Sequence, residues 1–155
     1  MAMTPRTSEN SVHDLLQAFL DCEELRMQAV RRLDVPEANK YVLKAAAAAE
    51  ALSKTAEGRA EIEKLLGHAT LYVRVRAAGA VMDWAPDKAI PVFGSMLDAD
   101  LSSIPSIDER LDIRVISRDW LYKHFNIRSA NRNDLIEPLR AYGIELEHRD
   151  ESRWQ

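Results

Sequence analysis

Two segments of the chain follow the same residue pattern and constrain the fold more than any other feature. LYVRVRAAGAV begins at Leu71, and LDIRVISRDWL begins at Leu111, so the two are offset by 40 residues (111 − 71). Arg74 matches Arg114 at this offset, with aliphatic residues on both sides. The preceding stretches, KLLGHA and SMLDAD, align at an offset of 31, so the second unit carries nine additional residues (40 − 31) between its helices. Repeated helix pairs of this size predict an α-solenoid.

The rest of the chain also has the apolar spacing of helices, with apolar residues three and four positions apart. Proline, glycine and capping residues divide it into about seven expected helices. These cover residues 11–33, 36–55, 58–67, 71–84, 86–97 and 109–125, and a last short helix ends at Gly143. The run Ala45–Ala49 predicts a close helix–helix contact, because alanine favours helix and leaves room for a neighbour. The sequence therefore predicts an all-α protein.

The expected organisation is one helical domain with short flanking segments. We expect a flexible polar arm at 1–10, one domain at 11–143 and a charged tail at 144–155. The segment 98–107 is rich in Ser, Asp and Pro and predicts a loop. This loop exposes three aliphatic residues unless they fold back onto the core: Leu101, Ile104 and Ile107.

The repeated pattern resembles HEAT repeats, whose second helix opens with a Val-Arg pair followed by small residues. Val73-Arg74 and Ile113-Arg114 fit this pattern, and Asp108 stands six residues before Arg114, where HEAT repeats often carry an aspartate. The resemblance implies a HEAT/ARM-like α-α superhelix. It also implies that both arginines are structural and bond loop carbonyls or a carboxylate, since a buried charge needs a partner.

The segment GHATLYVRVRAAGAVMDWAPDKA, with two longer helices before it, is similar to a small bacterial HEAT-like family. This is the domain-of-unknown-function family DUF-twenty-nineteen, and the similarity covers roughly residues 15–97. It implies a fold but no activity, since the family has no agreed one.

Small and bulky residues of the repeats have expected packing roles. Residues 77–79 are Ala-Ala-Gly and allow a neighbouring helix to approach closely. Trp84 and Trp120 supply bulk to the core, and their indole N–H groups need acceptors. Cys22 is expected to be a small core residue.

No group of residues has the spacing of a catalytic centre or a metal site, so we expect neither an enzyme nor a cofactor. The four histidines are not spaced as metal ligands. We expect His68, which replaces the HEAT aspartate of the first repeat, to make a loop hydrogen bond. His124 is expected at a helix C-terminus. The acidic pairs are expected on solvated faces: Glu23/Glu24 and Asp98/Asp100.

The expected functional surface is the helix face opposite the core. Aromatic residues and arginines are common anchors of binding surfaces. The candidate partner-binding residues are Tyr72, Arg76, Asp83, Asp112, Arg118, Asp119 and Lys123. They predict a non-catalytic protein–protein interaction module that binds one other protein. By analogy with small acidic bacterial proteins of this shape, it would be an immunity or regulatory protein. An ordinary solvated helix face is the other interpretation of the same residues.

The alternative is a HEAT-like DNA-binding or DNA-glycosylase-type protein. Its arginine stripe would comprise Arg74, Arg76, Arg114, Arg118 and Lys123. A net charge of −4 and the interrupting aspartates disfavour binding to nucleic acid. A homodimer formed through the loop or the tail is a third hypothesis, and the sequence leaves the oligomeric state open. With one cysteine and no long apolar run, we expect a cytoplasmic protein without a membrane span.

Overall fold

The computed structural model describes residues 8–150, and every regular element in that range is helical. The α-helices are α1 (Ser8–Arg31), α2 (Val35–Ser53), α3 (Ala56–Lys64), α4 (Leu71–Val81), α5 (Pro86–Met96), α6 (Ile107–Phe125) and α7 (Ile136–Arg140). Two short 3-10 segments are η1 (Leu65–Gly67) and η2 (Arg132–Leu135). The prediction of an all-α chain with about seven helices is confirmed for these residues. Backbone packing separates two compact units, Met1–Val73 and Arg74–Gln155, with the boundary inside α4.

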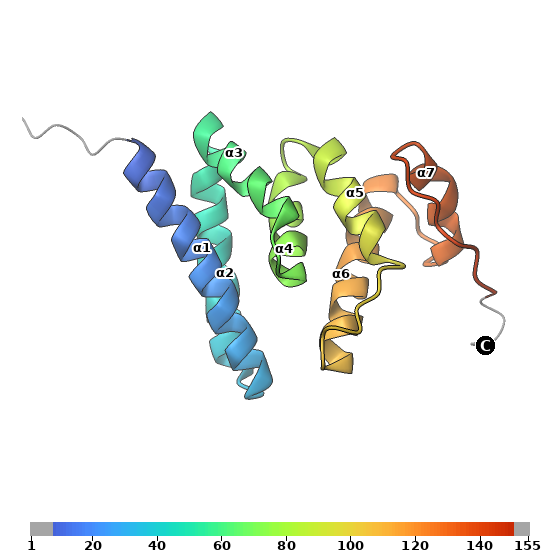
Figure 1. Cartoon of the computed structure of the whole chain (residues 1–155), viewed down its shortest axis with the longest axis horizontal. Coiled ribbons are helices and arrows are strands. Elements are labelled where there is room, and N and C mark those ends of the chain that lie inside the picture. Colours follow the sequence, from blue (N-terminus) through green and yellow to red (C-terminus); the bar gives the residue numbers. More distant parts are fainter. Residues whose placement is uncertain (1–7, 151–155) are drawn as a thin grey trace, which may run out of the picture. The chain divides into compact units, whose positions relative to one another are not determined.

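The first unit is built on an antiparallel hairpin of α1 and α2 (Figure 1). Leu33 has a φ of 60° and turns the chain between the two helices. The carboxylate of Asp34 then caps α2 by accepting a hydrogen bond from the N–H of Glu37 at 3.1 Å. Pro36 suits the first turn of α2 because that turn leaves its N–H groups without helical partners. The break expected between the first two helices therefore lies at residues 32–34.

The third helix begins earlier than expected because Gly58 lies inside it. Thr55 caps α3 by accepting a hydrogen bond from the N–H of Gly58 at 2.9 Å. A Cβ at Gly58 would overlap the carbonyl of Leu52, so glycine is required by the close approach of two helix ends. The expectation that Gly58 marks the start of this helix is wrong, because the helix begins at Ala56 and Gly58 serves packing within it.

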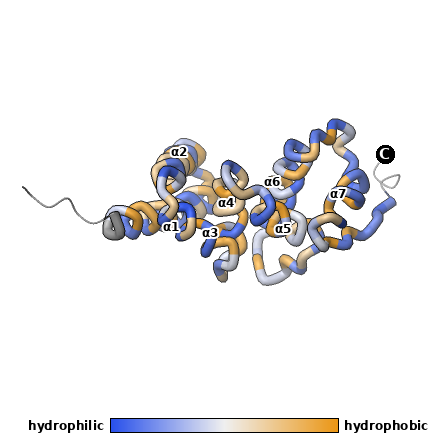
Figure 2. The backbone as a smooth tube through the Cα atoms, turned by 90° about the horizontal axis from the view of Figure 1, so that it is seen from above, coloured by the Kyte–Doolittle hydropathy of each residue, from blue (hydrophilic) through white to orange (hydrophobic). Residues whose placement is uncertain are grey.

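Each helix of the first unit buries one side and exposes the other, and hydrophobic and hydrophilic residues alternate along the tube in Figure 2. The buried interior is aliphatic and aromatic, with Phe19, Ala29, Leu52 and Ile62 at its centre. In the alanine run of α2, Ala45 and Ala48 are buried. The close helix contact expected there is formed against α1.

The second unit is organised around α5 and α6, which pack against each other. Its fully buried side chains are Val75, Val81, Ile90, Phe93, Ile113, Ser117, Leu121, Leu135 and Leu139. Phe93 of α5 stacks on Trp120 of α6 with ring centroids 5.9 Å apart. A Cβ at Gly79 would come within 3.4 Å of the Trp120 indole, so the small residues of α4 do allow close approach. Trp120 itself is only half-buried.

Residues 144–150, the described part of the expected tail, pack against the rest of the second unit. Leu146 is buried, and the side chain of Ile144 lies against Gly94 of α5. Further along the segment, the N–H of Glu147 donates to Asp98 and the N–H of Arg149 donates to Asn133. At the other end, α1 begins at Ser8, three residues before the expected start at Ser11. Residues 1–7 and 151–155, which carry the rest of the expected arm and tail, lie outside the described residues.

The inserted loop between α5 and α6 is partly folded back. Leu101 is buried and Ile104 is half-buried, whereas Ile107 is exposed and forms the first residue of α6. Of the three aliphatic residues expected to be exposed unless they fold back, Leu101 and Ile104 fold back and Ile107 stays exposed.

Candidate protein-docking face

Local sequence signals fix both ends of α6, the helix that carries most of the candidate residues. Ser106 caps it by accepting a hydrogen bond from the N–H of Glu109 at 3.3 Å. Asn126 ends it in the left-handed conformation with a φ of 55°. The inner side consists of Glu109, Ile113, Ser117 and Leu121, which follow at four-residue steps. The opposite side of α6 is therefore oriented away from the unit's own core.

Three aliphatic residues lie exposed along that opposite side. Ile107, Leu111 and Val115 are 67%, 55% and 40% exposed and follow at four-residue steps. We call this line of residues the α6 stripe. With a rise of about 1.5 Å per residue it extends about 12 Å along the helix. A continuous exposed apolar line of this kind is unusual in a polar helix and is typical of interaction sites.

Carboxylates follow one edge of the α6 stripe. Asp108, Asp112 and Asp119 lie on the same side of the helix at 100° per residue, next to the aliphatic line. Asp108 and Asp119 are exposed, and Asp112 is half-buried. We call these three residues the acidic edge.

The arginines on the other edge are bonded to the chain itself. Arg110 donates from Nε to the carbonyl of Ile104 at 2.5 Å. Arg114 donates to the carbonyls of Met96, Leu97 and Ala99 at 2.8, 2.6 and 2.9 Å. Burial, the main cause, and the nearby Arg149 and Arg132 lower the pKa of Arg114, while Asp98 opposes the shift. Both arginines thus direct several of their N–H groups to the segment before α6.

Arg118 continues the line of the α6 stripe by one further turn. Its guanidinium lies 5.8 Å from the ring centroid of Tyr122, within the range of a cation–π contact. Its Nε atom is buried and has no hydrogen-bond acceptor in the part of the chain that the structure describes. The stripe therefore ends in a positive charge supported by an aromatic ring.

Tyr72 does not lie where the sequence predicted it. The prediction placed it on an exposed face, but its side chain is only 6% exposed. The guanidinium of Arg26 from α1 lies 5.2 Å from its ring centroid. A helix in the middle of a chain is covered on more than one side, so the face opposite its first core contact is not automatically free. The expectation of Tyr72 as an accessible binding residue is wrong.

The other candidate residues divide between the two helices of the second unit. On α4 and the turn after it, Arg76 is half-buried and Asp83 is exposed. On α6 the structure gathers Asp112, Arg118, Asp119 and Lys123 around the stripe and its flank. Lys123 has its ammonium group 5.5 Å from the centroid of the Trp120 ring.

Sequence reasoning missed the aliphatic part of this face. The repeat aligned Leu111 with Leu71 and Val115 with Val75, and neither Leu111 nor Val115 was among the candidate binding residues. Val75 is fully buried, whereas Val115 is 40% exposed. The signal was available, because 107, 111 and 115 share one helix face that lies opposite Ile113.

The structural roles expected within the repeat are fulfilled most clearly at Arg114. Its three carbonyl partners are the loop acceptors that the HEAT resemblance implied. Asp108 is exposed in the first turn of α6, where a carboxylate suits the helix dipole. Arg74 and Trp84 are both half-buried.

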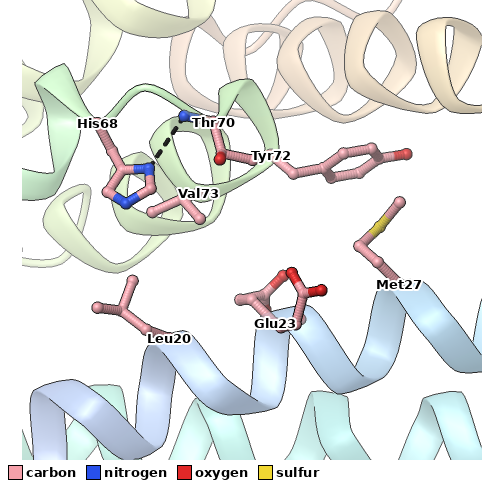
Figure 3. Close-up of a pocket in the computed structure, with 8 residues that line it drawn as sticks. Leu20, Glu23, Met27, His68, Thr70, Tyr72 and Val73 are labelled. Carbon is pink, nitrogen blue, oxygen red and sulfur yellow. Dashed lines mark hydrogen bonds between the residues drawn. The ribbon is translucent and has the colours of Figure 1, made fainter. Parts of the chain in front are cut away.

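The first unit contains a cavity of about 210 Å³ whose lining includes Glu23 and Tyr72 (Figure 3). Glu23 of α1 lines it, and its carboxylate accepts a hydrogen bond from Nε of Arg26 at 3.2 Å. Both side chains are 5% exposed, so the expectation of a solvated Glu23 is wrong. Arg26 lies three residues after Glu23 and supplies the opposite charge that a buried carboxylate needs. The guanidinium of Arg26 also lies over the ring of Tyr72. Glu24 is exposed, as expected.

His68 makes the loop hydrogen bond that the sequence predicted. The N–H of Thr70 donates to its Nδ1 at 3.0 Å, which leaves the proton of the neutral ring on Nε2 (Figure 3). His124 is exposed in the last turn of α6. Cys22 is buried, as predicted, and burial raises the pKa of its thiol, with Lys44 opposing the shift. A raised pKa is the opposite of what a thiolate nucleophile requires.

Asp98 has a structural role that the sequence did not predict. Its carboxylate forms ion pairs with Arg132 and Arg149 and accepts a hydrogen bond from the N–H of Glu147. The expectation of a merely solvated carboxylate is wrong because the returning C-terminal segment brings these donors to it. Asp100 is exposed, and hydrogen bonds from Ser102 lower its pKa.

Among residues 8–150, no three His, Cys, Asp or Glu side chains gather as potential metal ligands. None of the helices described is long and apolar enough to cross a membrane. The chain matches no protein-family model, and no curated protein or solved structure is significantly similar to it. The proposed kinship with HEAT-like proteins and with the DUF-twenty-nineteen family therefore stays a prediction.

Proposed function

We propose that this chain is a non-catalytic protein–protein interaction module that binds one partner protein through the outer face of α6. The observation that carries the proposal is the α6 stripe, in which Ile107, Leu111 and Val115 are exposed in one line. Burying these side chains in an interface removes apolar surface from water, which favours association. Charged residues on both flanks would then set the orientation and exclude wrong partners.

The geometry favours docking over catalysis. The stripe is a convex helix face, whereas small-molecule sites are concave and enclose most of their ligand. Near the cavity of the first unit, the buried Glu23 already has Arg26 as its partner. Within the repeat, Arg114 donates to three loop carbonyls. These charged groups therefore have structural roles, and the exposed aliphatic line remains to be explained.

A HEAT/ARM-like superhelix and a regulatory or immunity role belong to the same proposal. The α5–α6 pair, with Arg114 holding the loop between its helices, supports the HEAT-like interpretation. Masking another protein by surface complementarity requires only a face of this kind. We propose the cytoplasm as its location, because the single cysteine is buried and free.

Nucleic acid is less well supported as the target. Phosphate binding needs several basic side chains that can reach one backbone. Arg114 is occupied by carbonyls, and the acidic edge lies along the same helix.

The test is affinity capture from a lysate of the native source after nuclease treatment. Wild-type protein, Leu111→Asp and Leu43→Asp serve as baits, because Leu43 is an exposed leucine of α2 outside the stripe. One stoichiometric protein should be captured by wild type and Leu43→Asp and lost with Leu111→Asp. The partner is then purified and titrated calorimetrically to confirm direct binding. If no purified candidate binds the wild-type chain directly, the proposed function is wrong.

A further inference from the structure

The α6 stripe carries information about the shape of its partner. Its three aliphatic residues repeat at four-residue steps along about 12 Å of one helix. Side chains in such a row form a ridge that fits the groove between the side-chain rows of another helix. A partner helix with aliphatic residues three and four positions apart would cover Ile107, Leu111 and Val115 together.

The charges beside the stripe indicate the composition of that helix. On one side lies the acidic edge, in which Asp108 and Asp119 are exposed. On the other side Arg110 and Arg114 direct N–H groups to carbonyls of the preceding segment, which holds these two side chains against the chain itself. Carboxylates are therefore the charged groups best placed to pair with an incoming helix, and lysine or arginine would complement them.

The end of the stripe gives a direction. Arg118 lies one turn beyond Val115 and is positioned by the ring of Tyr122. An acidic residue near one end of the partner helix would meet this guanidinium. The same helix would carry basic residues along the edge that faces Asp108 and Asp119.

We propose that the α6 stripe binds an amphipathic, basic-edged α-helix of a partner protein. The inference rests on the proposed protein-binding function and names the element that is recognised. Anionic lipid and nucleic acid fit less well, because the acidic edge would repel their phosphates. A second copy of this chain is the competing occupant.

The experiment is a selection from a displayed library of helical peptides with fixed aliphatic positions. The edge positions of the library sample Lys, Glu and Ser equally. The full-length chain is the bait, and Leu111→Asp and Leu43→Asp are the paired variants. Selected peptides should carry Lys on the edge and bind wild type and Leu43→Asp about tenfold or more tightly than Leu111→Asp. The double variant Asp108→Lys with Asp119→Lys should select Glu on the same edge.

Three results would overturn the inference. One is a selection that yields no peptide dependent on Leu111. Another is a preference for Glu at the edge positions that face Asp108 and Asp119 in peptides selected by wild type. The third is a wild-type dimer in sedimentation velocity that Leu111→Asp dissociates, because a second copy would then occupy the stripe. A partner protein that binds wild type and is lost with Leu111→Asp, together with a selection that yields no helical peptide dependent on Leu111, would keep the proposed function while removing this inference.

Discussion

Arg149 donates a hydrogen bond from Nη2 to the carboxylate of Asp98 at 2.9 Å, across 51 positions of the sequence. Arg132 pairs with the same carboxylate, and its side chain is only 11% exposed. The N–H of Glu147 completes the set at 3.3 Å. One aspartate thus joins the end of α5, the 3-10 segment η2 and the C-terminal segment.

Replacing Asp98 should release the C-terminal segment. Asp98→Asn removes the charge that compensates Arg132 and weakens two further contacts of the segment. The free energy of unfolding should fall by about 1–3 kcal/mol, the usual range for a broken charge-assisted bond. Amide hydrogen exchange at Leu146 and Glu147 should rise more than exchange in α1.

A matched control for this change is Asp83→Asn, which removes another exposed carboxylate of the second unit. Its unfolding free energy should stay within about 0.5 kcal/mol of wild type. Unchanged protection of residues 144–150 in Asp98→Asn would show that the ion pairs do not hold the segment.

Gly58 should tolerate no side chain, although it lies in a helix. Gly58→Ala would gain about 1 kcal/mol from helix propensity alone. The new Cβ would overlap the carbonyl of Leu52, and relieving such overpacking costs about 1–3 kcal/mol. We therefore expect a net loss of stability in urea denaturation. Gly67→Ala is the control, because its Cβ meets nothing within 4 Å. Equal stability of the two variants would contradict the close approach.

Much of the fold could be predicted because its signals are local. Apolar spacing located the helices, and the proline at position 36 placed the start of the second one within a residue or two. The resemblance to HEAT repeats implied that Arg114 bonds loop carbonyls or a carboxylate, and its acceptors are carbonyls. Periodicity and capping act over one or two turns, so one sequence is sufficient to reveal them.

The features that the sequence did not predict depend on distant segments. Glu23 is buried because Arg26 and the helix turn beginning at Leu71 come together. Asp98 gains its partners from residues 34 and 51 positions away. Whether a charged side chain is solvated depends on what covers it, and a helical pattern describes only the element that carries it. The same limit explains the error at Tyr72.

The thiol of Cys22 should react slowly with iodoacetamide in the native protein. Burial raises its pKa, so less thiolate is present at a given pH, and the side chain is also shielded. Since the folded pKa is higher than the unfolded one, this group's contribution to stability is complete below the unfolded pKa. It is lost as the pH rises through the folded pKa.

Mass spectrometry of timed alkylation samples measures the rate, with denatured protein as the fully reactive reference. The control is Ala47→Cys in a Cys22→Ala background, because position 47 is exposed on α2. The introduced cysteine should react at a rate close to that of the denatured reference. Equal native rates for Cys22 and the introduced cysteine would contradict the burial of the thiol.

Val75 and Val115 occupy matching positions of the repeat and should respond differently to the same substitution. Val75 is fully buried, so Val75→Ala should lower the free energy of unfolding by about 1–2 kcal/mol through lost burial and a small cavity. Val115 is 40% exposed, and Val115→Ala should change stability by less than about 0.5 kcal/mol, because alanine also favours helix. Chemical denaturation of both variants measures the difference. Equal destabilisation would mean that Val115 is covered as Val75 is, and the α6 stripe would then be part of the core. If Val115→Ala leaves the free energy of unfolding unchanged but weakens partner binding, Val115 contributes to docking and not to folding.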